Sequence, residues 1–369
     1  MKQIILLLVT TLTVFVAIAQ MDLPPVGFNP RATISEEVGI TSITIKYSRP
    51  GVKGREGRIW GGVVAYGFGT FNFITNAMSS PWRAGANEAT IISFEHDVKV
   101  EGKELKAGTY AIFMAMDTAN VTVIFSKQSD AWGSFYYKPE DDVLRIYVKP
   151  LVLDKSVERL KYEFIEQTEK SCVIALHWEM MSVPFKVEVD VDNIVLARMR
   201  TEFTGVKGFI SANKLQASAY CFDRNIDMDE ALGWAQSAVT GKPFGQSGFD
   251  AYTNLATGYE KLDRLPQADS VMNEGLAIAN MNQCINYGRT MITKKRSDRA
   301  IEVMLGARTK FGDKYVVNNG LTYAYSAKGD YKKALEFAHK ALVQAADQRS
   351  KARLTTNIEN LKAGKDINQ

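Results

Sequence analysis

Hydrophobic and polar residues alternate with a period of two between residues 40 and 190. The alternating apolar positions are Ile43, Ile45 and Tyr47, then Tyr110, Ile112, Met114 and Met116, then Val183, Phe185, Val187 and Val189. Successive side chains of a strand point to opposite faces, so this pattern predicts half-buried strands. Further candidate strands span residues 89–94, 121–126, 143–148, 160–165 and 172–178. Roughly eight or nine short strands, with Gly and Asp turns such as Val100-Glu101-Gly102-Lys103, predict an all-β antiparallel sandwich.

Past Val191 the hydrophobic period becomes helical, and four segments in the last third of the chain align. These are Met228-Asp229-Glu230-Ala231-Leu232, Leu265-Pro266-Gln267-Ala268-Asp269, Ser297-Asp298-Arg299-Ala300-Ile301 and Tyr331-Lys332-Lys333-Ala334-Leu335. Their alanines are 37, 32 and 34 residues apart, a spacing typical of tetratricopeptide repeats, in which small residues let neighbouring helices approach closely. Residues 350–361 predict an amphipathic helix that caps the array. We therefore expect two domains, the sandwich and an all-α tetratricopeptide-like solenoid.

The first 20 residues have the pattern of a secretory signal peptide. Lys2 precedes an apolar run, and Ala17-Ile18-Ala19 predicts cleavage after Ala19. An uncleaved anchor helix is the alternative, but about 16 apolar-rich residues fall short of the roughly 20 that span a bilayer. No later stretch is apolar enough to span a membrane. We expect a signal peptide at 1–19, the sandwich at 20–194, a linker or first helix at 195–210 and repeats at 211–369. The exported protein would be periplasmic, with the cell surface or the medium as alternatives.

Charge and cysteine content give little indication of a partner. The formal charge is +4, and loss of Lys2 leaves +3. Basic residues gather at Lys294-Lys295-Arg296-Ser297-Asp298-Arg299, but no aromatic residue is interleaved, so we interpret this run as a solvated loop and expect no nucleic-acid partner. Cys172, Cys221 and Cys284 lack the spacing of metal or redox sites. They predict buried apolar side chains, and a disulfide between Cys221 and Cys284 is the alternative.

Unusual residue types crowd together between Tyr47 and Thr90. The runs are Tyr47-Ser48-Arg49-Pro50, Lys53-Gly54-Arg55, Gly61-Gly62, Tyr66-Gly67 and Pro81-Trp82-Arg83-Ala84-Gly85-Ala86-Asn87-Glu88-Ala89-Thr90. Together with Ala107-Gly108-Thr109-Tyr110, Trp178-Glu179 and Val183-Pro184-Phe185, they resemble the bacterial domain-of-unknown-function family 2911 over about residues 30–190. The chain departs from the family at Arg31-Ala32-Thr33, where an Arg-x-Ser-Pro start is usual, and at Gly69 to Ser80, which reads as an insertion. The resemblance implies a fold and an exported location, but no established activity.

The same region supplies the candidate ligand-binding residues, which are Arg49, Arg55, Tyr66, Trp82, Arg83, Asn87 and Glu88. A guanidinium binds carboxylate or phosphate through two parallel hydrogen bonds, and an aromatic face stacks on a sugar. These residues therefore predict a small anionic or glycan ligand. In the alternative, Arg83 and Glu88 pair with each other or with backbone carbonyls and hold a long loop against the sheet. Convergence of the polar side chains on an open concavity would favour a ligand site.

In the repeats, the second, fifth, ninth and twelfth positions of each first helix are expected to face a concave groove. The groove residues that we expect to contact a partner are Tyr220, Thr253, Thr257, Glu260, Arg289, Asn319 and Tyr323. This lining lacks the Lys and Asn clamp with which some tetratricopeptide domains hold a C-terminal carboxylate, so that ligand class is not expected. Solenoids use such surfaces to bind other chains, and we expect another envelope protein or peptide as partner. Alternatively, the array only rigidifies or spaces the sandwich.

The sequence contains no complete catalytic constellation. His96, His177 and His339 lack metal-ligand spacing, and no Gly-rich phosphate loop is present. His177 and Glu179 share one strand face, an arrangement that is more often part of a cross-strand pair than of an acid–base site. The leading hypothesis is therefore a non-catalytic exported binding or scaffold protein without cofactor or metal. The alternative is a cell-wall or glycan-directed hydrolase, with Glu88, His177 or Glu179 as acid or base and Arg83 as an anion clamp.

Overall fold

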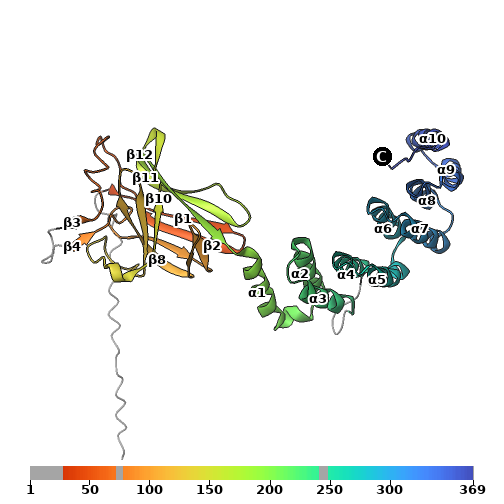
Figure 1. Ribbon diagram of the computed structural model, residues 1–369, viewed down its shortest axis with the longest axis horizontal. Coiled ribbons are helices and arrows are strands. Elements are labelled where there is room, and N and C mark those ends of the chain that lie inside the picture. Colours follow the sequence, from red (N-terminus) through yellow and green to blue (C-terminus); the bar gives the residue numbers. More distant parts are fainter. Residues whose placement is uncertain (1–27, 72–77, 241–247, 369) are drawn as a thin grey trace, which may run out of the picture. The chain divides into compact units, whose positions relative to one another are not determined.

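A computed structural model describes residues 28–71, 78–240 and 248–368 (Figure 1). The chain divides into two compact units that meet between Leu196 and Ala197. Strands build most of the first unit, which we call the β domain, and helices build the second, which we call the repeat unit. The predicted signal peptide lies outside the described residues. No helix in the described ranges is long and apolar enough to cross a membrane.

The described part of the β domain contains two antiparallel sheets and a short hairpin. The six-stranded sheet has the order β1 (Arg31–Val38), β2 (Thr41–Ser48), β5 (Thr90–Phe94), β8 (Gly108–Met116), β9 (Val121–Ser126) and β10 (Asp142–Val148). The four-stranded sheet has the order β11 (Leu151–Ile165), β12 (Ser171–Val189), β6 (Val98–Val100) and β7 (Lys103–Leu105). The hairpin pairs β3 (Gly69–Phe71) with β4 (Met78–Ser80), inside the predicted insertion.

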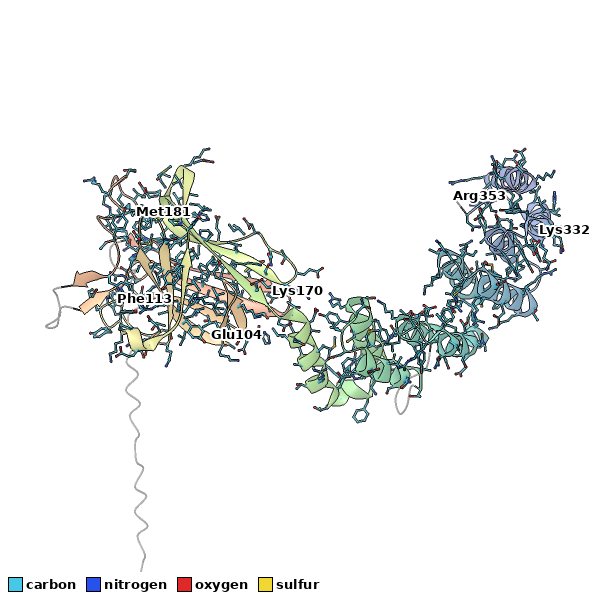
Figure 2. The ribbon with its side chains drawn as sticks, viewed as in Figure 1. Glu104, Phe113, Lys170, Met181, Lys332 and Arg353 are labelled. Carbon is cyan, nitrogen blue, oxygen red and sulfur yellow. The ribbon has the colours of Figure 1, made fainter. Side chains whose placement is uncertain are left out.

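The core lies between the apolar faces of the two sheets, and the predicted antiparallel sandwich is confirmed. The alternating residues of β2, β8 and the end of β12 are buried in one cluster. Across the interface, the rings of Phe125 in β9 and Phe185 in β12 meet edge to face, 5.9 Å between centroids. The predicted turn between β6 and β7 has positive φ at both central residues, 48° at Glu101 and 75° at Gly102, as a tight two-residue hairpin turn requires. Side chains fill the space between the sheets (Figure 2).

Several strands differ from the prediction in length or were not predicted. The sequence predicts separate strands at 172–178 and 183–189, but β12 runs through both. Glu179 has a φ of 52°, and the register against β11 shifts on both sides of its pairing partner Val157. A bulge therefore bends the strand without ending it. The edge strand β1 was not predicted, because up to Val38 its side chains alternate only between exposed and partly buried positions.

The repeat unit is an array of helix pairs, as predicted. The pairs are α2 (Ser211–Arg224) with α3 (Met228–Thr240), α4 (Phe249–Lys261) with α5 (Leu265–Ile278), α6 (Met281–Thr293) with α7 (Ser297–Phe311) and α8 (Tyr315–Lys328) with α9 (Tyr331–Gln344). The predicted capping helix is α10 (Gln348–Lys362), and α1 (Val191–Phe203) occupies most of the segment predicted as a linker or first helix. The four aligned alanines are all 0% exposed. Tight packing at these positions explains why the repeats keep a small residue there.

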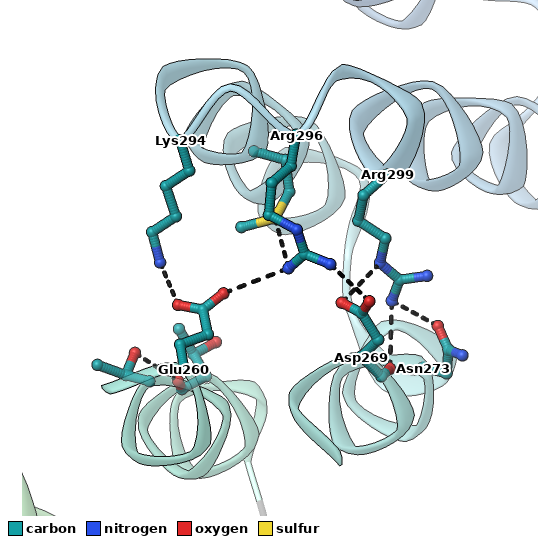
Figure 3. Close-up of polar contacts among 9 residues, drawn as sticks. Glu260, Asp269, Asn273, Lys294, Arg296 and Arg299 are labelled. Atoms are coloured by element: carbon teal, nitrogen blue, oxygen red, sulfur yellow. Dashed lines mark hydrogen bonds and ion pairs between the residues drawn. The ribbon is translucent and has the colours of Figure 1, made fainter. Parts of the chain in front are cut away.

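Ion pairs join the second and third repeats (Figure 3). Lys294 and Arg296 bind Glu260 of α4, and Arg296 Nη2 is also 2.6 Å from Asp269 Oδ2 of α5. Arg299 of α7 reaches Asp269 Oδ1 at 3.4 Å and donates to Asn273 Oδ1 at 2.6 Å. The side chains of Arg296 and Arg299 are only 21% and 7% exposed. The interpretation of this basic run as a solvated loop is therefore wrong for these two arginines, because they hold one repeat against the next.

The three cysteines are free and buried. Burial raises the pKa of Cys172 and of Cys221 to about 11. A thiol with such a pKa is protonated at neutral pH and behaves as a small apolar side chain, which agrees with the sequence-based interpretation.

Candidate functional site

The β domain contains a cavity of about 400 Å³ beside the loop that joins β4 to β5. Three basic residues line this Arg83 cavity: Lys53, Arg55 and Arg83. The other polar lining residues are Asn29, Ser80, Asn87 and Ser134. No carboxylate is among the described residues that line it. Basic side chains therefore outnumber acidic ones among the described residues that line the cavity.

Arg83 provides the most unusual group of this site. Its side chain is partly buried, and no carboxylate in the described part of the chain lies within ion-pair distance of it. Its Nη1 donates to the carbonyl oxygen of Asn87 at 2.9 Å, and its guanidinium lies 5.7 Å from the ring centroid of Phe135. A Cβ at Gly133 would come within 2.7 Å of Nη1, so the glycine makes room for the guanidinium. Burial lowers the pKa of Arg83. A desolvated cation of this kind is stabilised by a bound anion.

The loop that carries Arg83 is held in an unusual backbone conformation. Ala84 and Asn87 have positive φ values of 51° and 58°, and left-handed backbone at residues other than glycine costs roughly 1–3 kcal/mol each. The carbonyl oxygen of Ala84 accepts hydrogen bonds from Thr90 Oγ1 at 3.0 Å and from the Tyr162 hydroxyl at 2.9 Å. A Cβ at Gly85 would come within 2.6 Å of Thr90 Oγ1. The core therefore fixes this loop, and with it the position of Arg83.

Tryptophan rings and two unsatisfied polar atoms form another part of the wall. Trp82 and Trp178 line the cavity and stack with 5.9 Å between centroids, and Trp60 packs edge-on against both. Trp178 Nε1 and Ser80 Oγ are buried and have no hydrogen-bond partner among the described residues. An unpaired buried polar group costs about 1–3 kcal/mol. These two atoms therefore leave part of the wall short of hydrogen bonds.

The structure divides the seven predicted ligand residues into two groups. Arg55, Trp82, Arg83 and Asn87 line the cavity, whereas Arg49, Tyr66 and Glu88 are not among its lining residues. Arg49 Nε donates to the carbonyl oxygen of Leu160 at 3.0 Å. Arg55 lies at the cavity but gives its Nε and Nη2 hydrogens to the carbonyl oxygens of Val52 and Gly51. Of the polar side chains Arg49, Arg83, Asn87 and Glu88, only Arg83 and Asn87 line the cavity, so the four do not converge on it.

Glu88 is held on the other side of the loop. It forms an ion pair with Arg31 of β1, whose Nε lies 3.0 Å from Oε1, and it accepts a hydrogen bond from Ser48 Oγ at 3.0 Å. Arg83 and Glu88 therefore do not pair with each other. Arg83 does donate to a backbone carbonyl oxygen of its own loop, as the same alternative expected. Burial acts to raise the pKa of Glu88, but hydrogen bonds from its own backbone, Arg31 and Ser48 outweigh that effect, and the pKa is lowered.

The acid and base candidates of the hydrolase hypothesis do not gather around Arg83. His177 Nε2 lies 3.3 Å from Glu163 Oε2 on the neighbouring strand β11, so it does form a cross-strand pair. Burial lowers the pKa of His177, although the charge of Glu163 acts in the opposite direction. Both carboxylate oxygens of Glu179 accept backbone N–H bonds, from Gly57 at 2.9 Å and Met180 at 3.0 Å. Neither side chain lines the cavity.

The predicted groove residues of the repeat unit also divide into two groups. Arg289, Asn319 and Tyr323 line a cavity of about 670 Å³, together with Ile292, Thr293, Lys295, Arg353 and Asn368. Outside it, the hydroxyls of Thr253 and Thr257 donate to carbonyl oxygens of their own helix, and the Arg224 guanidinium lies 4.0 Å from the Tyr220 ring centroid. Glu260 is engaged by Lys294 and Arg296, as described above.

Comparisons with known proteins agree with this two-part architecture. Residues 29–187 match the family described as protein of unknown function (DUF2911). This match covers the β domain and confirms the resemblance drawn from its motifs. No curated protein matches the chain.

Solved structures similar to part of the chain contain helical repeats. One is the crystal structure of the APC/C hetero-tetramer Cut9–Hcn1, with 15% identity, 47% of this chain and 33% of that chain covered, and a TM-score of 0.29. PilF of Pseudomonas aeruginosa has 20% identity, coverage of 42% and 68%, and a TM-score of 0.28. MamA of Desulfovibrio magneticus RS-1 has 16% identity, coverage of 44% and 98%, and a TM-score of 0.27. The chain thus spans a third of the first of these proteins. Such low scores carry no functional argument, and the repeat assignment rests on the helix pairs and their buried alanines.

Among the cavity-lining residues that were not predicted from the sequence are Lys53, Ser80 and Trp178. Lys53 and Trp178 belong to the sequence runs on which the family resemblance was based, so the sequence did indicate that these two residues could be functional. Ser80 ends the segment interpreted as an insertion, where no chemistry was expected. In the repeat unit, Lys295, Arg353 and Asn368 were missed because they lie outside the first helices of the repeats.

Proposed function

We propose that this protein is an exported, non-catalytic binding protein in which the β domain holds a small anionic ligand and the repeat unit docks another protein. The observation that carries the ligand proposal is Arg83, a partly buried guanidinium without a carboxylate partner among the described residues, at a cavity lined by two further cations. The volume of about 400 Å³ suits a small molecule, since ligand sites usually enclose about 300–1,000 Å³.

The chemistry of the wall favours a carboxylate or phosphate group over a neutral sugar. A guanidinium has five N–H donors, and Arg83 commits one of them to Asn87. Its remaining donors can form the parallel pair of bonds that carboxylates and phosphates accept. Trp178 is only 1% exposed, so its ring face is not offered for stacking on a sugar.

Titration calorimetry of the full chain with sodium phosphate and sodium citrate, at constant ionic strength, tests this proposal. Removal of a hydrogen bond to a charged group costs about 1.5–3 kcal/mol, so Arg83→Met should weaken binding by about tenfold to a hundredfold. Arg83→Lys keeps the charge without the planar fork and should give an intermediate affinity. The matched control is Arg58→Met in the adjacent loop, because Arg58 is exposed, does not line the cavity and bonds to the Gly54 carbonyl oxygen. Equal affinities of the Arg83→Met and Arg58→Met proteins, or no binding of either anion, would refute it.

The export part of the proposal rests on the signal-peptide pattern of residues 1–19. Expression of the full chain in a bacterium with two membranes, followed by fractionation and mass measurement, tests it. We expect a periplasmic protein whose first residue is Gln20. A cytoplasmic product that retains Met1 to Ala19 would contradict export.

A further inference from the structure

We infer that the cavity between α6, α8 and α10 is the docking site for an acidic peptide segment of the partner protein. This inference rests on the proposed docking role of the repeat unit and adds the chemical class of the partner. Arg289 comes from α6, Lys295 from the turn that follows it, and Arg353 from the capping helix α10. No acidic residue is among the described residues that line this cavity. Figure 2 labels Arg353 on its helix.

The three cations are exposed and, unlike the basic residues nearby, have no acidic partner among the described residues. No ion pair is formed by Arg289, Lys295 or Arg353 within the described ranges, and Arg353 makes only a hydrogen bond of 3.3 Å, to the Tyr315 hydroxyl. In contrast, the neighbouring Lys294 is paired with Glu260, as Figure 3 shows. In this turn, Lys294 therefore forms a structural ion pair, whereas the next residue, Lys295, lines the cavity. Concentrated charge of one sign attracts a partner of opposite charge.

The cavity also offers a group suited to a peptide backbone. Asn319 of α8 is 4% exposed, and its Oδ1 is buried without a hydrogen-bond partner among the described residues. This acceptor needs a donor, and an extended peptide supplies one N–H per residue. Tyr323, one helical turn further on, already accepts from Asn357 Nδ2 at 3.1 Å, so its hydroxyl hydrogen remains for a peptide carbonyl or a carboxylate. Ile292 adds an apolar contact.

These features favour an acidic peptide over nucleic acid. The phosphate backbone of a nucleic acid carries no N–H donor for Asn319, and single-stranded nucleic acids are held largely by stacking on aromatic rings. Tyr323 is the one aromatic side chain among the described lining residues, and its hydroxyl is engaged by Asn357. A segment rich in Asp or Glu satisfies both the cations and the amide oxygen.

The direct test is fluorescence anisotropy of the full chain with a short labelled peptide rich in Glu and amidated at its C-terminus, so that only side chains carry charge. We expect saturable binding that weakens at least tenfold in Arg289→Glu and in Arg353→Glu. The matched control is Lys332→Glu on α9, because Lys332 is exposed and does not line the cavity. The same peptide with Gln in place of Glu should not bind, and a labelled single-stranded DNA should bind more weakly than the acidic peptide. Melting temperatures of all variants should match that of the parent.

The inference is overturned if the Gln peptide or the DNA binds as tightly as the Glu peptide, or if Arg289→Glu weakens binding no more than Lys332→Glu. Cross-linking of the full chain in cells separates this failure from failure of the docking role. If the parent and the Arg289→Glu protein recover the same cross-linked partner in equal amounts, the docking role of the repeat unit stands. The proposal that this cavity binds an acidic peptide is then refuted. Absence of any cross-linked partner, together with no binding of the acidic peptide, rejects both.

Discussion

A single methyl group added at Gly258 should loosen the contact between the first two repeats. Gly258 lies in α4, against the ring of Phe222 from α2. A Cβ at this position would come within 2.3 Å of Phe222 Cζ and 2.8 Å of both Cε atoms, closer than side-chain carbons approach in folded proteins. Phe222 is almost fully buried, so its ring cannot turn aside without moving α2 away from α4. Gly258→Ala should therefore destabilise the repeat unit, although alanine is the better helix former.

The size of the loss in unfolding free energy can be worked out by comparing Gly258→Ala with a matched substitution, Gly233→Ala. In a helix interior, Ala is favoured over Gly by about 1 kcal/mol, and overpacking of a filled interior costs about 1–3 kcal/mol. Gly233 of α3 is exposed, and a Cβ there would meet no atom within 4 Å. Gly233→Ala should therefore stabilise the protein by about 1 kcal/mol. Because the helix-propensity gain is common to both variants, their difference isolates the steric cost, about 1–3 kcal/mol.

Urea unfolding of the full chain, followed by the helical signal in circular dichroism, measures this difference. The signal reports chiefly on the repeat unit, because most residues of the β domain lie in strands and loops. The stability of a repeat array depends on the interfaces between neighbouring repeats. A weaker contact between α2 and α4 should therefore lower the urea midpoint of Gly258→Ala below that of the parent. If Gly258→Ala is as stable as Gly233→Ala, the close packing of Phe222 on α4 is incorrect.

Three further predictions concern the ion-pair network and two titratable groups. Asp269→Ala leaves the 7%-exposed Arg299 without its aspartate and should lower the free energy of unfolding by about 2 kcal/mol, with little dependence on salt; an unchanged urea midpoint would contradict this. The pKa of Glu88 is lower in the folded than in the unfolded chain, so its stabilisation is present above the unfolded pKa and is lost as the pH falls through the folded value. Glu88→Gln should therefore flatten the loss of stability between about pH 5 and pH 3, and an unaltered pH profile would argue against the Arg31 pair. The Cys172 thiol, with a pKa raised to about 11 by burial, should resist alkylation at about pH 8 until the chain unfolds; rapid labelling of the native protein would show that it is accessible.

The repeat architecture could be predicted because its signal is local and recurrent. Each aligned alanine lies in a segment that forms its own helix, and the spacing between alanines is set by two helices and two turns. The strands of the core were equally readable from the alternation of Ile43, Ile45 and Tyr47. Edge strand β1 was not, because a strand with little buried surface has no reason to alternate apolar and polar residues.

The candidate site was harder to predict because contacts distant in sequence decide it. Arg83 and Glu88 are five positions apart, and proximity in sequence suggested a pair. The backbone between them is left-handed at Ala84 and Asn87, and Arg83 lines the cavity whereas Glu88 does not. Glu88 instead pairs with Arg31, which is 57 residues away in sequence. The cavity wall likewise draws residues from several separate segments of the chain. The sequence therefore indicated which residue types could bind an anion in this region, but not which of these residues line the same cavity.

The stacked indoles beside Arg83 give the molecule an intrinsic optical reporter. Three of its five tryptophans, Trp60, Trp82 and Trp178, form one cluster. With 5.9 Å between the centroids of Trp82 and Trp178, their electronic transitions couple, and the near-ultraviolet spectrum depends on the relative orientation of the rings. A ligand that contacts the partly buried Trp82, which lines the cavity, would also shift the emission of that ring. Occupancy can thus be followed without a dye, and screening of candidate metabolites needs only an unmodified sample and a spectrofluorimeter.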